Sequence, residues 1–417
     1  MSKTIAEKIL SEKSGSEAKA GDIVVAQVNL AFVQDTTGPL TVRQFKAANF
    51  KKLAPGLQGA VFLDHAAPSQ SREMSNDHML LRKFAADTGA KLHDVGDGVC
   101  HQLVAETLAK PGDLIIGSDS HTVTAGALGA FACGMGSSDV AVVFGLGRTW
   151  FRVPESFLIE VSGKFSKGVF AKDLVLSLIG QIGADGATYK SLEFSGAGLK
   201  NLSIADRLTV ANMAVEAGAK VGLFPADEIT HEFLVKMGRG KDYKPITPDA
   251  GATYERKIHI DLAKVEPMVS RPHTVDNTVP VKDIKGLKIQ QVLIGTCTNG
   301  RLEDIEIAAR ILKGKKRSPQ TRVIITPASR RIMQEAIKAG YIETLLESGA
   351  AVMPPGCGAC LGLHQGVIGD GEACLSTANR NFKGRMGSAE GLVFLSSPAT
   401  AAASAITGVI TDPREFI

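Results

Sequence analysis

The chain has 417 residues, of which 44% are hydrophobic and 22% charged, a composition typical of a globular protein. Its formal net charge of +4, without basic runs interleaved with aromatic residues, argues against nucleic acid as a partner. No stretch has the apolar length that spans a bilayer, and the charged N-terminus lacks the apolar core of a signal peptide. We therefore expect a cytoplasmic protein that neither enters membranes nor binds nucleic acid.

Short apolar runs, each followed by a polar loop, recur along the first part of the chain. They predict strands at 22–28, 60–63, 91–95 and 114–116, with a helix at 75–87. This alternation is typical of an open α/β sheet, whose ligand sites lie beyond the carboxyl ends of the strands.

The pattern changes near residue 150, and a second unit begins with a strand at 156–161. Ser203 and Asp206 predict a capping box for a helix through Ala219, on which Asn212 and Glu216 share a face. Residues 267–283 are rich in Pro, Thr and charge, and we interpret them as a linker. A third unit follows, with predicted strands at 292–294, 323–325, 351–353 and 392–395. We therefore predict three α/β domains, at residues 1–154, 155–270 and 271–417.

Three cysteines predict a metal centre in the third unit. Cys357 and Cys360 lie three positions apart in a loop of Gly and Pro, and Cys297 follows the strand at 292–294. Electron-transfer clusters normally use four cysteines, so three suggest an iron–sulfur cluster with one open iron. Structural zinc remains an alternative, with Cys374 or His364 as the fourth ligand. A disulfide is scarce in cytosolic proteins, and a redox cysteine pair would leave Cys297 without a role.

Three histidines each lie at a predicted strand end or helix start: His65, His101 and His121. Asp64 precedes His65, but an extended backbone would turn the two side chains to opposite faces, so this dipeptide alone favours a solvated turn. The loop 117–122 holds an aspartate, a serine and a histidine together. A serine hydrolase is disfavoured because no G-x-S-x-G elbow is present.

The loop Asn379–Arg385 carries two arginines and a lysine after the cysteines. Charge alone would favour a solvated basic turn. Its position at the end of the cysteine-bearing unit favours carboxylate binding instead, because a guanidinium matches a carboxylate bidentately.

Together these segments resemble the aconitase superfamily in order and spacing, and the resemblance covers all three units. It rests on Asp64-His65, Gly98–Gln102, Gly117–Thr122, Asn212 with Glu216, Gly295–Asn299, Cys357–Cys360 and Asn379–Arg385. The resemblance implies three α/β/α units packed around a central cluster site. It also implies one [4Fe-4S] cluster per chain, bound by Cys297, Cys357 and Cys360, with one iron not bound by cysteine.

The resemblance further implies dehydration and rehydration of a hydroxy diacid, with the open iron acting as a Lewis acid. His101, paired with Asp119, would protonate the departing oxygen, its pKa raised by that carboxylate. The other residues implied are a second pair, Asp64 and His65; hydrogen-bonding groups at Ser120, His121, Asn212 and Glu216; and substrate contacts from Gln34, Asn379, Arg380 and Arg385.

Full-length members of the superfamily carry a swivelling fourth domain with the serine base, whereas this chain ends soon after its third unit. In two-subunit members a small subunit supplies that domain, so we expect a large subunit that needs this partner for activity. The expected reaction interconverts 2- and 3-isopropylmalate, as in leucine biosynthesis; homoaconitate, citramalate and dimethylmalate are alternative substrates. The mild charge disfavours the RNA-binding role of some relatives.

Overall fold

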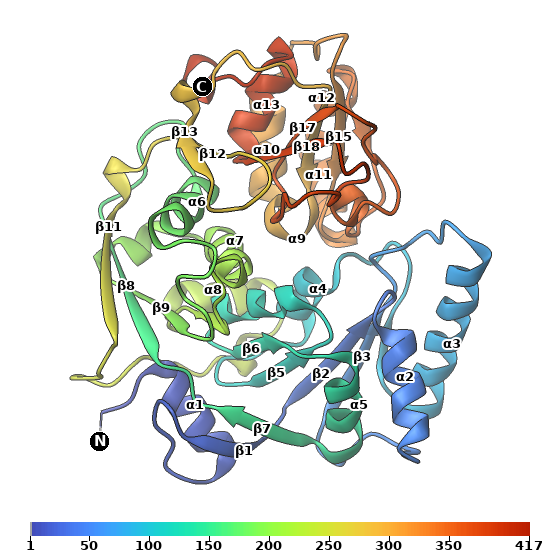
Figure 1. Ribbon diagram of the computed structural model, residues 1–417, viewed down its shortest axis with the longest axis vertical. Helices are drawn as coiled ribbons and strands as arrows, with labels where there is room; N and C mark the ends of the chain where they lie inside the picture. The colour runs from blue at the N-terminus through green and yellow to red at the C-terminus, as the bar shows by residue number, and fades with distance from the viewer. Residues whose placement is uncertain (1) are drawn as a thin grey trace.

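The computed structural model describes residues 2–417, which form three sheet-and-helix units (Figure 1). In this view the third unit lies at the top, the second at the left and the first at the lower right. At the centre, α9 (Thr296–Asn299) of the third unit contacts both α4 (Cys100–Thr107) of the first and α7 (Ile204–Met213) of the second. One buried apolar cluster contains residues of all three units, so the units share a continuous core.

The first unit contains a parallel sheet that is buried on both faces. Its strand order is β4 (Lys91–His93), β3 (Gln58–Phe62), β2 (Leu30–Gln34), β5 (Leu114–Gly117) and β6 (Phe131–Gly134). Helices cover both faces, which explains why β2 and β5 are buried along their whole length instead of alternating. The helices are α1 (Ile5–Ser14), α2 (Gly38–Ala47), α3 (Arg72–Thr88), α4, α5 (Ser137–Leu146) and the 3-10 helix η1 (Ser120–Leu128).

The strand predicted at 22–28 exists but does not belong to this sheet. It is β1 (Ile23–Gln27), which pairs antiparallel with β7 (Arg148–Arg152) in a separate ribbon. The central strand of the sheet is β2, which follows β1 after a two-residue interval and which we did not predict. We interpreted the first of these two successive apolar runs as a strand and assigned no strand to the second.

The second unit has a parallel sheet in the order β10 (Val221–Leu223), β9 (Ser191–Ser195), β8 (Ser156–Ser162) and β11 (Arg256–Asp261). The predicted capping box is confirmed, because Ser203 Oγ accepts from the Asp206 amide and Asp206 Oδ2 from the Ser203 amide. The helix α7 ends at Met213 and continues as the 3-10 helix η3 (Ala214–Ala217), rather than as one α-helix through Ala219. The remaining helices are α6 (Ala171–Ile182), α8 (Glu228–Lys236), η2 (Ala197–Asn201), η4 (Gly240–Asp242) and η5 (Leu262–Lys264).

The third unit has a mixed sheet in the order β13 (Thr278–Pro280), β12 (Met268–Ser270), β18 (Leu392–Ser396), β17 (Ala373–Ser376), β14 (Gln291–Gly295), β15 (Arg322–Thr326) and β16 (Ala351–Val352). Strands β18 to β16 are parallel, while β12 and β13 form an antiparallel edge. The linker predicted at 267–283 was wrong, because this segment supplies that edge. The helices are α9, α10 (Leu302–Leu312), α11 (Arg330–Lys338), α12 (Tyr341–Glu347), α13 (Pro398–Thr407), η6 (Val281–Asp283), η7 (Gly358–Leu361) and η8 (Pro413–Glu415).

The carboxyl ends of the first and third sheets meet. The amide of Cys357, in the loop after β16, donates to the carbonyl of Asp64, which follows β3, at 2.9 Å. His364 Nε2 likewise lies 2.9 Å from the carbonyl of His65. This junction brings loops that are far apart in sequence into one place.

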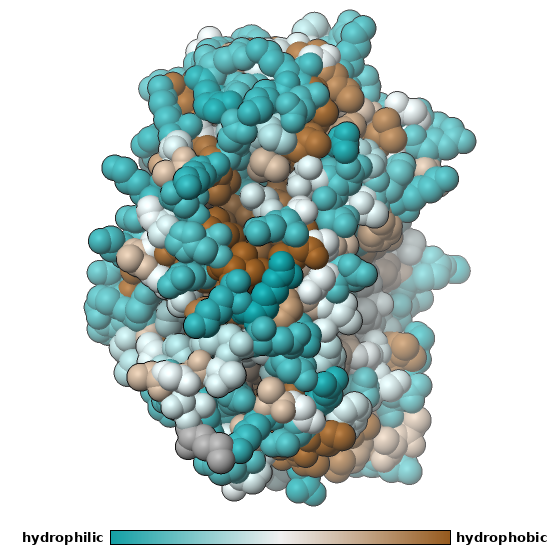
Figure 2. All heavy atoms as spheres, turned by 60° about the vertical axis from the view of Figure 1, so that its left-hand side comes forward, coloured by the Kyte–Doolittle hydropathy of each residue, from teal (hydrophilic) through white to brown (hydrophobic). Residues whose placement is uncertain are grey.

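Polar side chains cover most of the face shown in Figure 2, and hydrophobic residues gather in a hollow near its middle. Among residues 2–417, no helix combines the length and the apolarity needed to cross a bilayer.

Candidate active site and metal centre

Cys297 lies on the first turn after β14, and the backbone of Gly295 makes this turn possible. Gly295 has a φ of 146°, and a Cβ at this position would lie 2.1 Å from the carbonyl oxygen of Thr326. A side chain cannot be accommodated there, so the strand can turn sharply only at glycine. The turn leaves Cys297 4% exposed at the centre of the molecule.

One amide side chain contacts the sulfurs of two cysteines. Asn379 Nδ2 lies 3.5 Å from Cys297 Sγ, and Cys360 Sγ lies 3.7 Å from Asn379 Oδ1. Asn212 Nδ2 donates to Cys297 Sγ at 3.3 Å, and Arg385 Nη2 to Cys360 Sγ at 3.4 Å. The structure therefore brings together both cysteine loops, α7 and the basic loop.

The environment treats the three thiols differently. Burial raises the pKa of Cys297 to about 11. Hydrogen bonding from Cys357, with the nearby charge of Arg385, holds the pKa of Cys360 well below its usual range, and the same contact raises that of Cys357. Cys360 is therefore the thiolate that forms most readily.

Among residues 2–417, neither candidate for a fourth zinc ligand is hydrogen-bonded to Cys297, Cys357 or Cys360. Cys374 is on β17, where its sulfur is 3.7 Å from Gln291 Nε2, and His364 is bonded to the carbonyl of His65. Four thiolates on one zinc are about 3.8 Å apart, given Zn–S bonds of about 2.3 Å. Within residues 2–417, the groups of three ligand atoms that lie within 4.8 Å of one another do not include the three cysteines. A wider, multi-iron group fits these sulfurs better than a single zinc ion.

Asp64 and His65 lie together in the core, so the solvated turn favoured by the dipeptide alone was wrong. His65 Nδ1 is 2.9 Å from Asp64 Oδ1, and the two residues are 5% and 2% exposed. The chain bends here because both carboxylate oxygens of Asp35 accept backbone amides, from His65 at 2.9 Å and Ala66 at 3.0 Å. Asp64 Oδ2 also accepts the amide of Cys100, at the start of α4.

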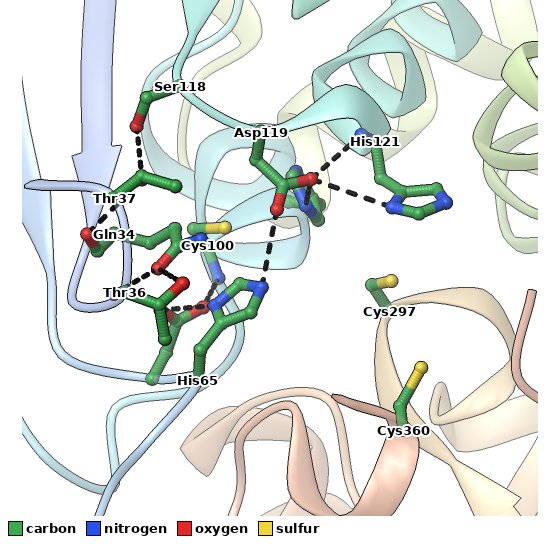
Figure 3. Close-up of polar contacts among 12 residues, drawn as sticks. Gln34, Thr36, Thr37, His65, Cys100, Ser118, Asp119, His121, Cys297 and Cys360 are labelled. Atoms are coloured by element: carbon green, nitrogen blue, oxygen red, sulfur yellow. Dashed lines mark hydrogen bonds and ion pairs between the residues drawn. The ribbon is translucent and has the colours of Figure 1, made fainter. Parts of the chain in front are cut away.

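Asp119 is the centre of the histidine group (Figure 3). Its carboxylate lies 3.0 Å from His101 Nε2, 3.4 Å from His65 Nε2 and 3.5 Å from His121 Nδ1. It also accepts the amide of His121 at 2.8 Å. Figure 3 shows Cys297 and Cys360 directed toward the space beside these rings. Three buried imidazoles therefore surround one carboxylate next to the sulfurs.

The pKa of His101 differs from the one we expected. Burial lowers the pKa of His101 and outweighs Asp119, so the predicted upward shift was wrong. Burial also opposes the charged form of His65, but Asp64 and Asp119 raise its pKa well above the usual value. Burial would raise the pKa of Asp119, but His101, His121 and His65 together hold it well below its usual range. Burial likewise opposes the charged form of His121, but Asp119 and Glu216 raise its pKa. At neutral pH, His65 is thus charged and His101 neutral.

Glu216 joins the second unit to this group. Its Oε1 lies 2.8 Å from His121 Nε2, and Arg380 Nε donates to its Oε2 at 3.0 Å. Burial would raise the pKa of Glu216, but His121 and Arg380 lower it. Asn212 lies four positions earlier, and its Nδ2 donates to Thr124 Oγ1 at 2.9 Å. Asn212 and Glu216 therefore both contact η1, as expected for two residues on one face.

Two predicted residues lie at the margin of this group. Gln34 ends β2, and its Oε1 accepts from the amide and hydroxyl of Thr36 (Figure 3). Ser120 is half-buried at the start of η1 and lines a cavity of about 320 Å³ with Val123 and Lys220. Neither belongs to the hydrogen-bond network that joins the histidines and the cysteines.

Sequence reasoning missed Arg301 and Asp35. Arg301 is 3% exposed and donates to the carbonyls of Cys297 and Thr298, both at 2.7 Å. Arg301 could have been noticed because it is a charged residue four positions after Cys297, a proposed ligand. Asp35 follows β2 directly, in the place where α/β sheets present functional groups, and this position was its signal.

A family model for the aconitase family (aconitate hydratase) matches residues 7–286 and 281–408. The chain belongs to the aconitase family. Along its whole length it is 58% identical to the 3-isopropylmalate dehydratase large subunit of Elusimicrobium minutum, which is covered completely. It is 53% identical to large subunit 1 of that enzyme from Thermotoga maritima and to large subunit 2 from Archaeoglobus fulgidus, again with full coverage of both chains.

Among solved structures, aconitase X of Thermococcus kodakaraensis in its holo form aligns with a TM-score of 0.55 and 14% identity, covering 96% of this chain and 94% of that one. This likeness concerns the fold. The predicted aconitase-type α/β fold is confirmed, while the domain boundaries at 154 and 270 stay predictions. The strand β12 lies before the second boundary yet pairs within the third sheet.

Proposed function

We propose that this chain is the large subunit of a 3-isopropylmalate dehydratase, a hydro-lyase of leucine biosynthesis. The relatives above carry that name and match from end to end. The observation in the structure that carries the proposal is the Asn379 amide, which contacts both Cys297 and Cys360 beside the histidines around Asp119.

Cys297, Cys357 and Cys360 would hold one [4Fe-4S] cluster. When bound, it would supply a Lewis acid at the iron without a cysteine ligand, which polarises the hydroxyl group that leaves. The protein supports this assignment by burying the three sulfurs and donating to two of them from Asn212, Asn379 and Arg385.

Arg380 and Arg385 would bind the two carboxylates of the substrate. Arg385 is 8% exposed and its Nε has no hydrogen-bond partner, so this buried donor is free for a carboxylate. Arg380 is paired with Glu216, which orients its guanidinium. Asn379 lies between these arginines and the sulfurs, while Gln34 and Ser120 would contact substrate at the margin.

We assign protonation of the departing oxygen to His65. Asp64 and Asp119 keep its imidazole charged, so a proton is available at neutral pH. His101, neutral and also beside Asp119, would help to hold that carboxylate against His65. His121 would hold the substrate through a ring fixed between Asp119 and Glu216. The base that removes the C–H proton would belong to the small subunit.

The partner would be a small subunit with the swivelling domain, in keeping with the large-subunit names of the relatives. All six cysteines are free, which supports a reducing, cytoplasmic location. Homoaconitate, citramalate or dimethylmalate would be alternative substrates, each selected by a different small subunit.

The test is anaerobic co-expression with candidate small subunits and an assay of hydroxy diacids. We expect isomerisation of isopropylmalate by the complex and almost none by the chain alone. The control is the same complex with His65→Asn, which keeps the subunits together but removes the proton donor. Full activity of the isolated chain, or preference for another diacid, would contradict the proposal.

A further inference from the structure

Lys172, on the first turn of α6, is completely buried and has no carboxylate partner. It is 0% exposed, and its Nζ donates to the carbonyls of Thr377 at 2.7 Å and Ala378 at 2.5 Å. No carboxylate among residues 2–417 forms an ion pair with it. A buried ammonium held only by carbonyl groups is costly, so a counter-charge of another kind is needed.

The neighbouring Asp173 is directed elsewhere. Its Oδ1 accepts the amide of Met268 and its Oδ2 that of Phe170, each at 2.9 Å. Burial raises the pKa of Asp173 to about 7, so its carboxyl group is only partly ionised at neutral pH. Asp173 therefore caps α6 and joins it to β12 instead of neutralising Lys172.

The two carbonyls that Lys172 binds lie directly before Asn379. Thr377 Oγ1 also accepts the amide of Gly295 at 2.9 Å, two residues before Cys297. Lys172 thus holds the segment that joins the Cys297 turn to the Asn379 loop. Burial lowers the pKa of Lys172 to about 7, and negative charge on Cys360, Asp304, Cys297 and Asp173 acts in the opposite direction, with Cys360 the largest of these.

We propose that Lys172 is the buried counter-cation of the three-cysteine centre and positions the Asn379 loop against it. This inference rests on the proposed function, because three metal-bound cysteines must be deprotonated and bring negative charge into the core. With the cluster in place, the lysine would offset that charge. Without it, the charges of Asp304 and Asp173 are left to offset that of the lysine.

The test is Lys172→Met, which keeps the length of the side chain and removes the charge. Each variant is reconstituted anaerobically, and iron and sulfide per chain, iron loss to a chelator, and urea unfolding of the iron-free chain are measured. We expect iron to be lost about tenfold faster, the order of effect of one charge in a poorly solvated site. The iron-free variant should unfold at a lower urea concentration, because the carbonyls of Thr377 and Ala378 lose their donor. The proposal would be overturned if Lys172→Met made the iron-free chain less stable but retained iron as well as the wild type, or if the variant did not fold.

Two matched controls separate the alternatives. Asp173→Asn should leave iron retention unchanged; equal losses of iron in both variants would mean that disturbance of the start of α6, and not the charge of Lys172, causes them. Arg207→Met removes another buried cation, paired with Asp227 at 2.7 Å, and should weaken the iron-free chain without faster iron loss. Failure of the wild-type chain to take up iron would count against the proposed function, whereas equal retention by wild type and Lys172→Met would overturn this inference alone.

Discussion

Arg301 Nη2 lies 2.7 Å from the carbonyl oxygen of Cys297. The same guanidinium donates to Gln102 of the first unit at 3.0 Å and to Thr209 of the second at 3.0 Å. Gln102 follows His101 on α4, so one side chain connects the Cys297 turn, the histidine helix and α7. The relative placement of the cysteine and the histidine thus depends on a residue that need not touch substrate.

Arg301→Met should destabilise the chain strongly, because it leaves buried carbonyls of the Cys297 turn without donors. We expect a loss of about 3 kcal/mol in the free energy of unfolding, measured by urea denaturation. The control is Arg310→Met, which removes an exposed pair with Glu306 on the neighbouring helix and should cost at most about 0.5 kcal/mol. Equal effects of the two substitutions would refute the central role of Arg301.

Cys357→Ser should abolish the brown colour of the reconstituted chain and its activity with the small subunit, because a thiolate ligand is lost. Cys374→Ala is the matched control, since Cys374 is buried on β17 away from the other sulfurs. Its colour and iron content should equal those of the wild type. Iron loss in Cys374→Ala would mean that the ligand set is wrong.

Asp64→Asn should move the alkaline limit of kcat/KM to lower pH. In the wild type the pKa of His65 is raised, so the charged imidazole persists above pH 6.5 and is lost as the pH rises through its folded pKa. Removing the Asp64 charge takes away the largest influence that raises that pKa, so the pKa falls. Asp97→Asn, beside His93 at 3.8 Å, should leave the profile unchanged. An identical profile in both variants would remove His65 from the proton-transfer step.

Arg380→Lys should raise the KM for the hydroxy diacid about tenfold or more, because an ammonium cannot replace a bidentate guanidinium. Lys383→Met alters an exposed cation of the same loop and should leave the KM unchanged. The measurement is steady-state kinetics of the reconstituted complex. Equal increases in KM for both variants would indicate a general charge effect of the loop rather than a contact from Arg380.

The cysteine set could be proposed from local features, because Cys297 follows a strand end closely and Cys357 and Cys360 share one loop of Gly and Pro. The convergence of Asp64 and His65 could not, since the bend depends on Asp35, about thirty positions earlier in the chain. The pKa of His101 could not be predicted either. Proximity to Asp119 is suggested by sequence order, but the opposing effect of burial appears only when three units close over the ring.

Local chemistry and short-range periodicity were enough to predict an α/β protein with polar groups at strand ends and the family to which the chain belongs, while the three cysteine ligands stay a proposal. Only the tertiary structure decided which charges are stabilised, because solvent exclusion and partners from distant segments set the protonation of His65, His101 and Lys172. Those quantities depend on what surrounds a side chain in space, and a linear order of residues does not contain that information.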